Sequence, residues 1–216
     1  MAQLVHIPVG SCTVEGLLVL PASSMGLVVF AHGSGSSRHS PRNNQVASVL
    51  QARRIGTLLL DLLTPEEDLD RHKRFDITLL AQRLLSVTHW LRQQRATRAL
   101  PLAYFGASTG AAAALLAAAE LGDDIRAVVS RGGRPDLAGP RDLARVRCPT
   151  LLLVGSLDDE VLMLNQLAAA ELHCPHALTV IAGATHLFEE PGTLDAVAGQ
   201  AADWFEQHLL SASITP

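Results

Sequence analysis

Short apolar segments alternate with longer segments of helical pattern along the chain, and this alternation constrains the fold more than any other feature of the sequence. Such an order is typical of a mostly parallel β-sheet covered by helices on both faces. Strands are expected at 5–8, 12–20, 27–31, 57–60, 100–105, 125–130, 150–154 and 178–181, and helices at 45–52, 76–95, 109–121, 161–172 and 194–210. Only a short turn at Gly10 separates the first two strands, so we expect an antiparallel hairpin there. The predicted fold class is α/β.

The composition favours one globular domain over residues 1–216, because no charged block or Pro/Gly/Ser-rich linker divides the chain. A net charge of −4 and an aromatic content of 4% are unlike those of nucleic-acid-binding proteins. The longest apolar run, 111–119, has about half of the length that a bilayer-spanning helix needs. Residues 1–8 lack the basic and apolar stretches of a secretory signal. We expect a cytoplasmic protein, monomeric or a small homo-oligomer, with no nucleic acid partner and no membrane insertion.

The cysteines and histidines do not form a metal-binding pattern. Cys12, Cys148 and Cys174 are far apart, and none belongs to a CxxC pair. His173, Cys174 and His176 are crowded together, but no second cluster is present to complete a tetrahedral site. We expect neither a metal nor a disulfide framework.

A G-x-S-x-G pentapeptide at 106–110 lies between an expected strand and an alanine-rich expected helix, with Ser108 at its centre. Flanking glycines permit a tight, strained turn that exposes the serine hydroxyl at the edge of the sheet. The N–H of Thr109 then opens the helix, where it can stabilise a developing oxyanion. The same pentapeptide also occurs as a plain tight turn, but its placement between strand and helix favours Ser108 as a nucleophile.

An acid and then a histidine should follow later strands if Ser108 is a nucleophile. Asp158 follows the strand at 150–154, and we prefer it, although Asp159 and Glu160 share the loop and are also suited to the first turn of a helix. His186 follows the last strand and is the histidine that fits this edge of the sheet. The predicted roles are general base for His186 and orientation of its ring for Asp158.

The loop at 32–37, after the first buried strand, is expected to supply the second oxyanion donor, which we assign to the N–H of Ser34. Its Gly and Ser residues also suggest a phosphate cradle. However, no Gly-Lys-Ser/Thr follows, and Arg38 occupies the last glycine position of a dinucleotide fingerprint. We therefore expect no nucleotide cofactor.

Three stretches, 29–36, 106–110 and 183–192, resemble the α/β-hydrolase superfamily, and in particular its dienelactone hydrolase-like group. The resemblance implies an α/β-hydrolase fold, a triad of Ser108, Asp158 and His186, and no cofactor. Dienelactone hydrolases proper have a cysteine nucleophile, whereas this chain has Ser108. The segment 130–148 is too short for the helical lid found in many lipases and epoxide hydrolases, so an open site with minimal or no lid is expected.

Several arginines are expected near the carboxyl edge of the sheet, where a guanidinium can hold a substrate carboxylate. The candidates are Arg131, Arg134 and Arg141 after the strand at 125–130, and Arg38 with His39 after the oxyanion loop. We select Arg131 and Arg134, with solvated surface arginines as the alternative.

The sequence predicts a serine hydrolase that cleaves small ester or lactone substrates through an acyl-enzyme. Two alternatives keep the same fold. One is an acyltransferase that uses the same triad, and the other is a non-catalytic protein that binds a small ligand in a hydrolase-like pocket.

Overall fold

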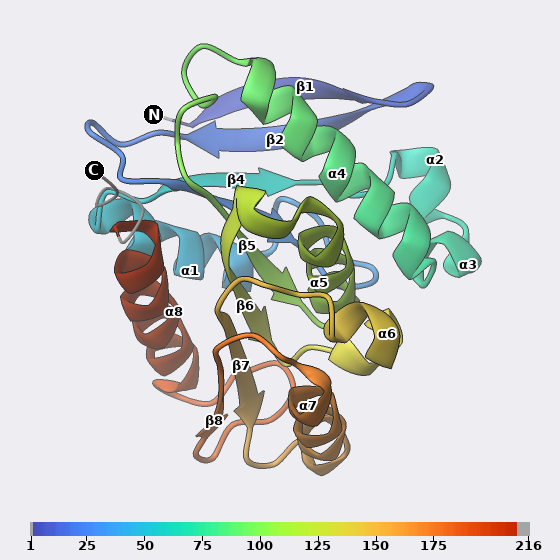
Figure 1. Ribbon diagram of the computed structural model, residues 1–216, viewed down its shortest axis with the longest axis vertical. Helices are drawn as coiled ribbons and strands as arrows, with labels where there is room; N and C mark the ends of the chain where they lie inside the picture. The colour runs from blue at the N-terminus through green and yellow to red at the C-terminus, as the bar shows by residue number, and fades with distance from the viewer. Residues whose placement is uncertain (1, 211–216) are drawn as a thin grey trace.

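An eight-stranded sheet forms the centre of the computed structural model, which describes residues 2–210 (Figure 1). Its strands are β1 (Gln3–Val9), β2 (Cys12–Val19), β3 (Leu27–Ala31), β4 (Gly56–Leu60), β5 (Leu102–Ala107), β6 (Ile125–Arg131), β7 (Thr150–Gly155) and β8 (His176–Ile181). They lie in the order β1-β2-β4-β3-β5-β6-β7-β8. The expected domain, 1–216, extends beyond the described residues at both ends.

Strand direction divides the sheet into two parts. β1 pairs with β2 and β2 with β4 in antiparallel fashion, which confirms the expected hairpin. All pairs from β4 across β3, β5, β6 and β7 to β8 are parallel. Every residue of β3, β4, β5 and β7 is buried, as expected for parallel strands covered on both faces. β1 instead alternates buried and exposed residues, because only one of its faces is covered.

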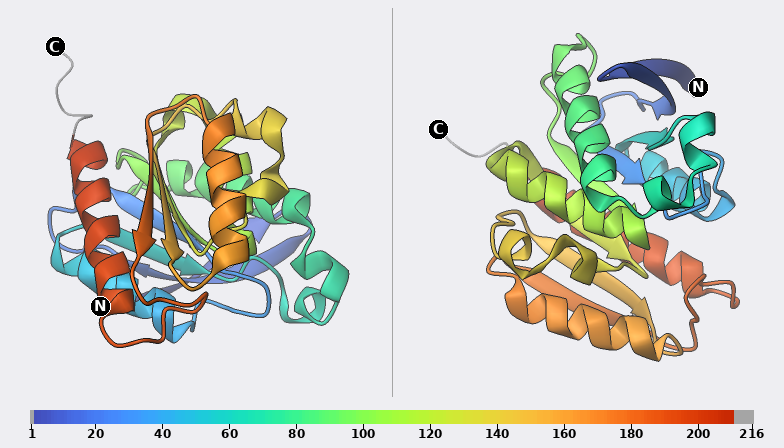
Figure 2. Two further views of the ribbon diagram at one scale, coloured as in Figure 1. Left: turned by 90° about the horizontal axis from the view of Figure 1, so that it is seen from below. Right: turned by 90° about the vertical axis from the view of Figure 1, so that its right-hand side faces the viewer.

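Five long helices cover the two faces of the sheet. They are α1 (Pro41–Ala52), α4 (Ile77–Gln93), α5 (Thr109–Leu121), α7 (Asp159–Glu171) and α8 (Thr193–Leu210). α1 and α8 lie on one face, and α4, α5 and α7 lie on the other (Figure 1). The views of Figure 2 show α7 and α8 on opposite sides of β8, and α4 beside α5. Each face has its own apolar core.

The alanine composition of α5 lets this helix pack close to the sheet. Its alanines from 111 to 114 are fully buried, and these short side chains keep the helix axis near the strands. Gly110, in its first turn, lies so close to β3 that a Cβ atom there would be 2.2 Å from the carbonyl oxygen of Ala31. The helix therefore begins directly against the end of β3, which brings the residue before it, Ser108, to the carboxyl edge of the sheet.

The start of α1 differs from the sequence-based expectation of 45. Ser40 caps the helix by accepting a hydrogen bond from the N–H of Asn43 at 3.3 Å, and Pro41 is its first residue. Proline is favoured at this position because its missing N–H would have no intrahelical partner there. The helix thus begins four residues earlier and places Arg42 in its first turn.

Short helices fill the connections where the sequence shows no helical periodicity. α2 (Pro65–Asp68) and α3 (Arg71–Arg74) precede α4, and α6 (Pro140–Leu143) lies between β6 and β7. The β6–β7 connection holds no larger helical insertion, which confirms the expectation of a minimal lid. No helix within residues 2–210 has both the length and the apolar composition needed to cross a membrane. The α/β fold class is confirmed.

Candidate active site

Ser108 occupies a strained turn between β5 and α5. Its backbone has φ 50° and ψ −123°, a left-handed conformation that is uncommon for a residue other than glycine. Neighbouring elements hold the turn: the N–H of Ser108 donates to the carbonyl oxygen of Arg131 at 3.3 Å, and its carbonyl oxygen accepts from the N–H of Arg134 at 3.0 Å. A Cβ on Gly106 would lie 2.4 Å from Cα of Ala111, so the turn requires glycine there. Such maintained strain is typical of a functional residue.

Asp158 and His186 are in direct contact. Nδ1 of His186 lies 2.6 Å from Oδ2 of Asp158, whose side chain is only 15% exposed. An ionised carboxylate only accepts hydrogen bonds, so Nδ1 carries the proton and Nε2 is left free to act as a base. Asp159, the alternative acid, is exposed as the first residue of α7. The geometry therefore favours Asp158 over Asp159.

The loops after β7 and β8 are tied together, and this brings Asp158 to His186. The N–H of Leu157 donates to the carbonyl oxygen of Ala184 at 2.9 Å, and the N–H of Gly183 donates to Oγ of Ser156 at 2.8 Å. A Cβ on Gly155 would lie 2.2 Å from the carbonyl oxygen of Ala184, so this close approach requires glycine. The two loops thus form one unit that presents the imidazole.

Ser108 and His186 line one cavity of about 250 Å³ at the carboxyl edge of the sheet. The loops after β3, β5, β6 and β8 surround it. Among the described residues, no hydrogen bond joins the hydroxyl of Ser108 to the imidazole of His186 in this conformation. Catalytic contacts of this kind are often long without substrate and tighten when it binds. The cavity is smaller than the roughly 300–1,000 Å³ of sites for drug-sized ligands, which favours a small substrate.

The two expected oxyanion donors differ in whether their N–H groups already have a hydrogen-bond acceptor. The N–H of Thr109 opens α5, where no intrahelical acceptor is available to it. The N–H of Ser34, however, donates to Oγ1 of Thr109 at 3.0 Å. In this conformation Ser34 is therefore not a free donor, which differs from the role assigned to it from the sequence. The bond instead ties the loop after β3 to the first residue of α5.

The two selected arginines take different positions. Arg131, the last residue of β6, is 8% exposed and lines the cavity that contains Ser108. The guanidinium of Arg134 instead pairs with the carboxylate of Asp136 through two hydrogen bonds of 2.9 and 2.8 Å, and Arg134 does not line this cavity. The structure thus does not place Arg134 where a substrate contact was expected. Arg38 is likewise occupied, because it pairs with Asp61 and Glu15.

Sequence reasoning missed one residue that lines the cavity and one that supports the loop beside it. Arg42 lines the cavity from the first turn of α1, and it was missed because the helix was expected to begin later. His32 is buried beneath the loop after β3: its Nδ1 lies 2.9 Å from the carbonyl oxygen of Gly33, and its Nε2 accepts from the N–H of Leu62 at 3.0 Å. Burial lowers the pKa of His32, so its ring is neutral and fixes the end of β3.

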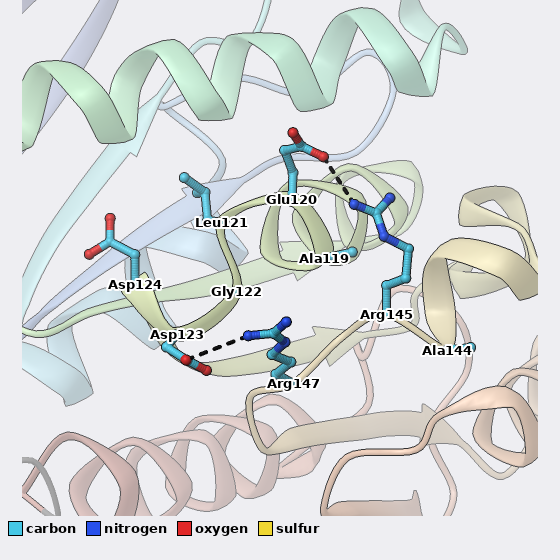
Figure 3. Close-up of a pocket in the computed structure, with 9 residues that line it drawn as sticks. All are labelled: Ala119, Glu120, Leu121, Gly122, Asp123, Asp124, Ala144, Arg145 and Arg147. Atoms are coloured by element: carbon cyan, nitrogen blue, oxygen red, sulfur yellow. Dashed lines mark hydrogen bonds and ion pairs between the residues drawn. The ribbon is translucent and has the colours of Figure 1, made fainter.

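A wider hollow of about 680 Å³ lies at the opposite edge of the sheet, around the end of α5 (Figure 3). Its charged side chains all have partners: Arg145 pairs with Glu120 at 3.2 Å, Arg147 with Asp123 at 3.6 Å, and Asp124 with Arg92, which lies outside the hollow. It contains no strained residue and no nucleophile next to a base. We therefore assign no chemistry to it, although it is larger than the cavity of Ser108.

No group of three or more His, Cys, Asp or Glu side chains within residues 2–210 is arranged to hold a metal ion. The cluster of His173, Cys174 and His176 also does not form such a group. The polar groups around Ser108 are a hydroxyl, an imidazole with its carboxylate, and guanidinium groups. This set is suited to acyl chemistry at the serine.

A serine on a strained strand-to-helix turn, with a histidine and an aspartate from later strands of the same edge, is the arrangement of an α/β hydrolase. The family model described as "Alpha/beta hydrolase domain" matches residues 24–208, and the chain belongs to this family. A crystal structure of dienelactone hydrolase from Anabaena variabilis is 52% identical to the chain, with a TM-score of 0.94 and coverage of 96% of this chain and 98% of that one. The resemblance to the dienelactone hydrolase-like group is confirmed.

Two further comparisons concern mycobacterial relatives and a second solved structure. Proteins of Mycobacterium tuberculosis strains CDC 1551 and H37Rv that bear the name "Putative phosphoribosyl transferase" are 58% identical over 205 residues. The match covers 95% of this chain but 46% of theirs, so the chain spans about half of their length. An α/β serine hydrolase without lid from Xanthomonas campestris has a TM-score of 0.78 at 21% identity, covering 100% of this chain and 97% of that one, and shows the shared fold.

Proposed function

We propose that the protein is a serine hydrolase that cleaves small carboxylic esters or lactones through an acyl-enzyme. The single observation that carries the proposal is the convergence on one cavity of Ser108, in its strained turn, and His186, which is held by Asp158 at 2.6 Å. A nucleophile and an oriented base at the same edge of the sheet are the parts that acyl transfer needs.

The reaction proceeds in two halves. His186 takes the proton from the hydroxyl of Ser108 through Nε2, and the oxygen attacks the ester carbonyl. The N–H of Thr109 stabilises the resulting oxyanion, and collapse of the tetrahedral intermediate expels the alcohol, which receives the proton from His186. In the second half, His186 activates a water molecule that releases the acid and restores Ser108. Asp158 keeps the proton on Nδ1 and stabilises the imidazolium in both halves.

The names of the relatives support different parts of this proposal. The dienelactone hydrolase of Anabaena variabilis matches this chain over nearly its whole length, which supports an ester or lactone substrate. The name "Putative phosphoribosyl transferase" belongs to proteins of which this chain matches 46%. We propose that any activity described by that name resides in the part of those relatives that this chain does not match.

The location and assembly expected from the sequence are kept here as proposals. Cys12, Cys148 and Cys174 are all free thiols, which fits a reducing compartment such as the cytoplasm. We propose a cytoplasmic enzyme, a monomer or small homo-oligomer, that needs no cofactor.

The decisive experiment compares wild type with Ser108→Ala on p-nitrophenyl acetate and p-nitrophenyl butyrate. Ser108→Ala should lower kcat by roughly a millionfold, as in comparable triads. Ser48→Ala, which alters an exposed serine on α1, is the matched control and should keep the wild-type rate. A fluorophosphonate probe should add covalently to Ser108 in the wild type, with the adduct located by peptide mass spectrometry.

The same experiment separates the alternatives. Unchanged turnover in Ser108→Ala would contradict the proposal, because another group would then be the nucleophile. A wild type that neither hydrolyses these esters nor reacts with the probe would also contradict it and would favour a ligand-binding role. Acyl transfer to added alcohols or thiols in preference to water would identify an acyltransferase on the same triad.

A further inference from the structure

Arg131 is a buried cation without a protein partner. The residue is 8% exposed, and neither Nε nor Nη1 has a hydrogen-bond acceptor among the described residues. Two other partly buried arginines are paired, by contrast: Arg134 with Asp136, and Arg92 with Asp124. Burying a guanidinium without an anion is costly, and buried charges are normally paired, so an anionic ligand could supply the partner that the protein lacks.

The charge of Arg131 persists at neutral pH. Burial, with a smaller contribution from the nearby positive charge of Arg42, lowers the pKa of Arg131 to about 10. That value still leaves the guanidinium protonated near pH 7. The unpaired group is therefore a true positive charge within the protein, next to a second one that repels it.

Arg42 also lines the cavity and adds to its positive potential. It lies in the first turn of α1, where the helix dipole is also positive, and its Nε has no partner among the described residues. Its Nη1 contacts Oε1 of Glu189 at 3.1 Å, but that carboxylate is 64% exposed and does not line the cavity. Of the residues that line the cavity, two are arginines and none is Asp or Glu.

Arg131 lies close to the nucleophile, Ser108. Its carbonyl oxygen accepts the N–H of Ser108 at 3.3 Å, and Arg131 pairs with Ala107 in the register of β5 and β6. Its side chain lines the same small cavity of about 250 Å³ as the serine. A substrate group that reaches the guanidinium must therefore lie only a few bonds from the ester carbonyl at Ser108.

We propose that the cavity is an anion subsite, in which Arg131 and Arg42 bind a carboxylate or phosphate group carried by a short substrate close to its scissile ester bond. The inference rests on the proposed ester hydrolysis and specifies its substrate class. Both oxyacid groups offer the paired oxygen atoms that match a guanidinium. A neutral ester of the same length leaves Arg131 buried and unpaired, so it is the poorer substrate.

Binding is tested first, in protein that cannot turn substrate over. Calorimetry on Ser108→Ala with succinate, with inorganic phosphate and with neutral succinamide should show binding of at least one anion and no binding of the amide. Adding Arg131→Met should weaken that binding by about tenfold or more, the usual effect of losing a charge-assisted hydrogen bond. Adding Arg134→Gln, which alters the paired arginine of the same loop, should leave it unchanged. The two anions distinguish a carboxylate from a phosphate as the preferred group.

Arg42→Gln is the second variant, because its side chain is 33% exposed and its loss does not open the core. Arg42→Gln should also weaken anion binding, and it keeps the proposal testable if Arg131→Met does not fold. Binding of neither anion to Ser108→Ala, or equal binding in Ser108→Ala with and without the Arg42 substitution, overturns the proposal.

Kinetics keep this inference separate from the proposed function. Wild type should prefer mono-p-nitrophenyl succinate to its neutral methyl ester in kcat/KM, and Arg131→Met should reduce that ratio. If neutral esters are hydrolysed through Ser108 but no anion binds, the subsite is wrong and the hydrolase stands. If anions bind in an Arg131-dependent manner and no ester is turned over, the subsite stands and the hydrolase is wrong.

Discussion

The hydroxyl oxygen of Thr109 accepts a hydrogen bond from the N–H of Ser34 at 3.0 Å and so connects the loop after β3 with the start of α5. The residue after the nucleophile thus has two roles: its N–H is the proposed oxyanion donor, and its side chain fixes the neighbouring loop. Gly33, in that loop, packs against Ser108 so closely that a Cβ on it would lie 3.0 Å from Cβ of the serine. A shift of this loop therefore changes the surroundings of the nucleophile.

Thr109→Val removes the acceptor while it keeps the shape of the side chain. Because the N–H of Ser34 loses its partner, we expect the free energy of unfolding to fall by about 1 kcal/mol. We also expect kcat on p-nitrophenyl acetate to fall, because oxyanion donors act only when they are held in place. Urea unfolding and ester hydrolysis measure the two effects. Thr109→Ser retains the hydroxyl and should behave like wild type, whereas equal losses in both variants would show that the bond is unimportant.

Asp158→Asn tests which acid orients the histidine. An amide cannot replace the carboxylate as acceptor and counter-charge for His186, so kcat on p-nitrophenyl acetate should fall by about 10⁴-fold, as in a comparable triad. Asp159→Asn alters an exposed residue at the start of α7 and should remain close to wild type. The reverse result, with Asp159→Asn the inactive variant, would move the acid by one residue and contradict the contact between Asp158 and His186.

The predicted parts of the fold and site are those with a strong local signal. Predominantly apolar runs marked β3, β5 and β7, and the glycines around Ser108 marked its turn. The order of strands in the sheet and the short helices α2 and α3 were not predicted, because four-residue helices have no periodicity and strand order depends on tertiary packing.

The direction in which a side chain points was the other feature that the sequence did not predict. Arg131 and Arg134 follow the same strand, yet Arg131 lines the cavity and Arg134 pairs with Asp136. Nothing in the spacing of two arginines determines which one finds a carboxylate. Arg42, in contrast, had a signal: Ser40 and Pro41 form a typical helix start, and recognising it places Arg42 in the first turn of α1.

Acid should destabilise the protein in part through His32. Burial lowers the pKa of His32 from its ordinary 6.5, so below that pH the unfolded chain binds a proton that the folded protein does not. The stabilisation is therefore present above about pH 6.5 and is lost as the pH falls further. His32→Gln should be less stable than wild type at neutral pH but should show a weaker dependence of unfolding free energy on pH.

Urea unfolding at several pH values gives the free energy of unfolding of His32→Gln and of wild type. The difference between the two isolates His32, because burial also lowers the pKa of His208 and so adds to the pH dependence of both proteins. His89→Gln is the matched control, since His89 is exposed on α4 and forms no hydrogen bond or ion pair with the described residues, and this variant should retain the wild-type change of unfolding free energy with pH. A His32→Gln protein with the full wild-type pH dependence would show that the buried imidazole is not the group responsible.

The buried thiols should be inert in the folded protein. Burial raises the pKa of Cys148 to about 12 and also raises that of Cys174, and only a thiolate reacts readily with iodoacetamide. Labelling of native protein at about pH 8 should therefore be confined to the partly exposed Cys12, while unfolding in guanidinium chloride exposes all three thiols. The same shift predicts that stability falls as the pH rises above about 9, because the unfolded chain forms the Cys148 thiolate first. Mass spectrometry of tryptic peptides locates the label. Rapid modification of Cys148 in the native state would contradict its burial in the apolar core just before β7.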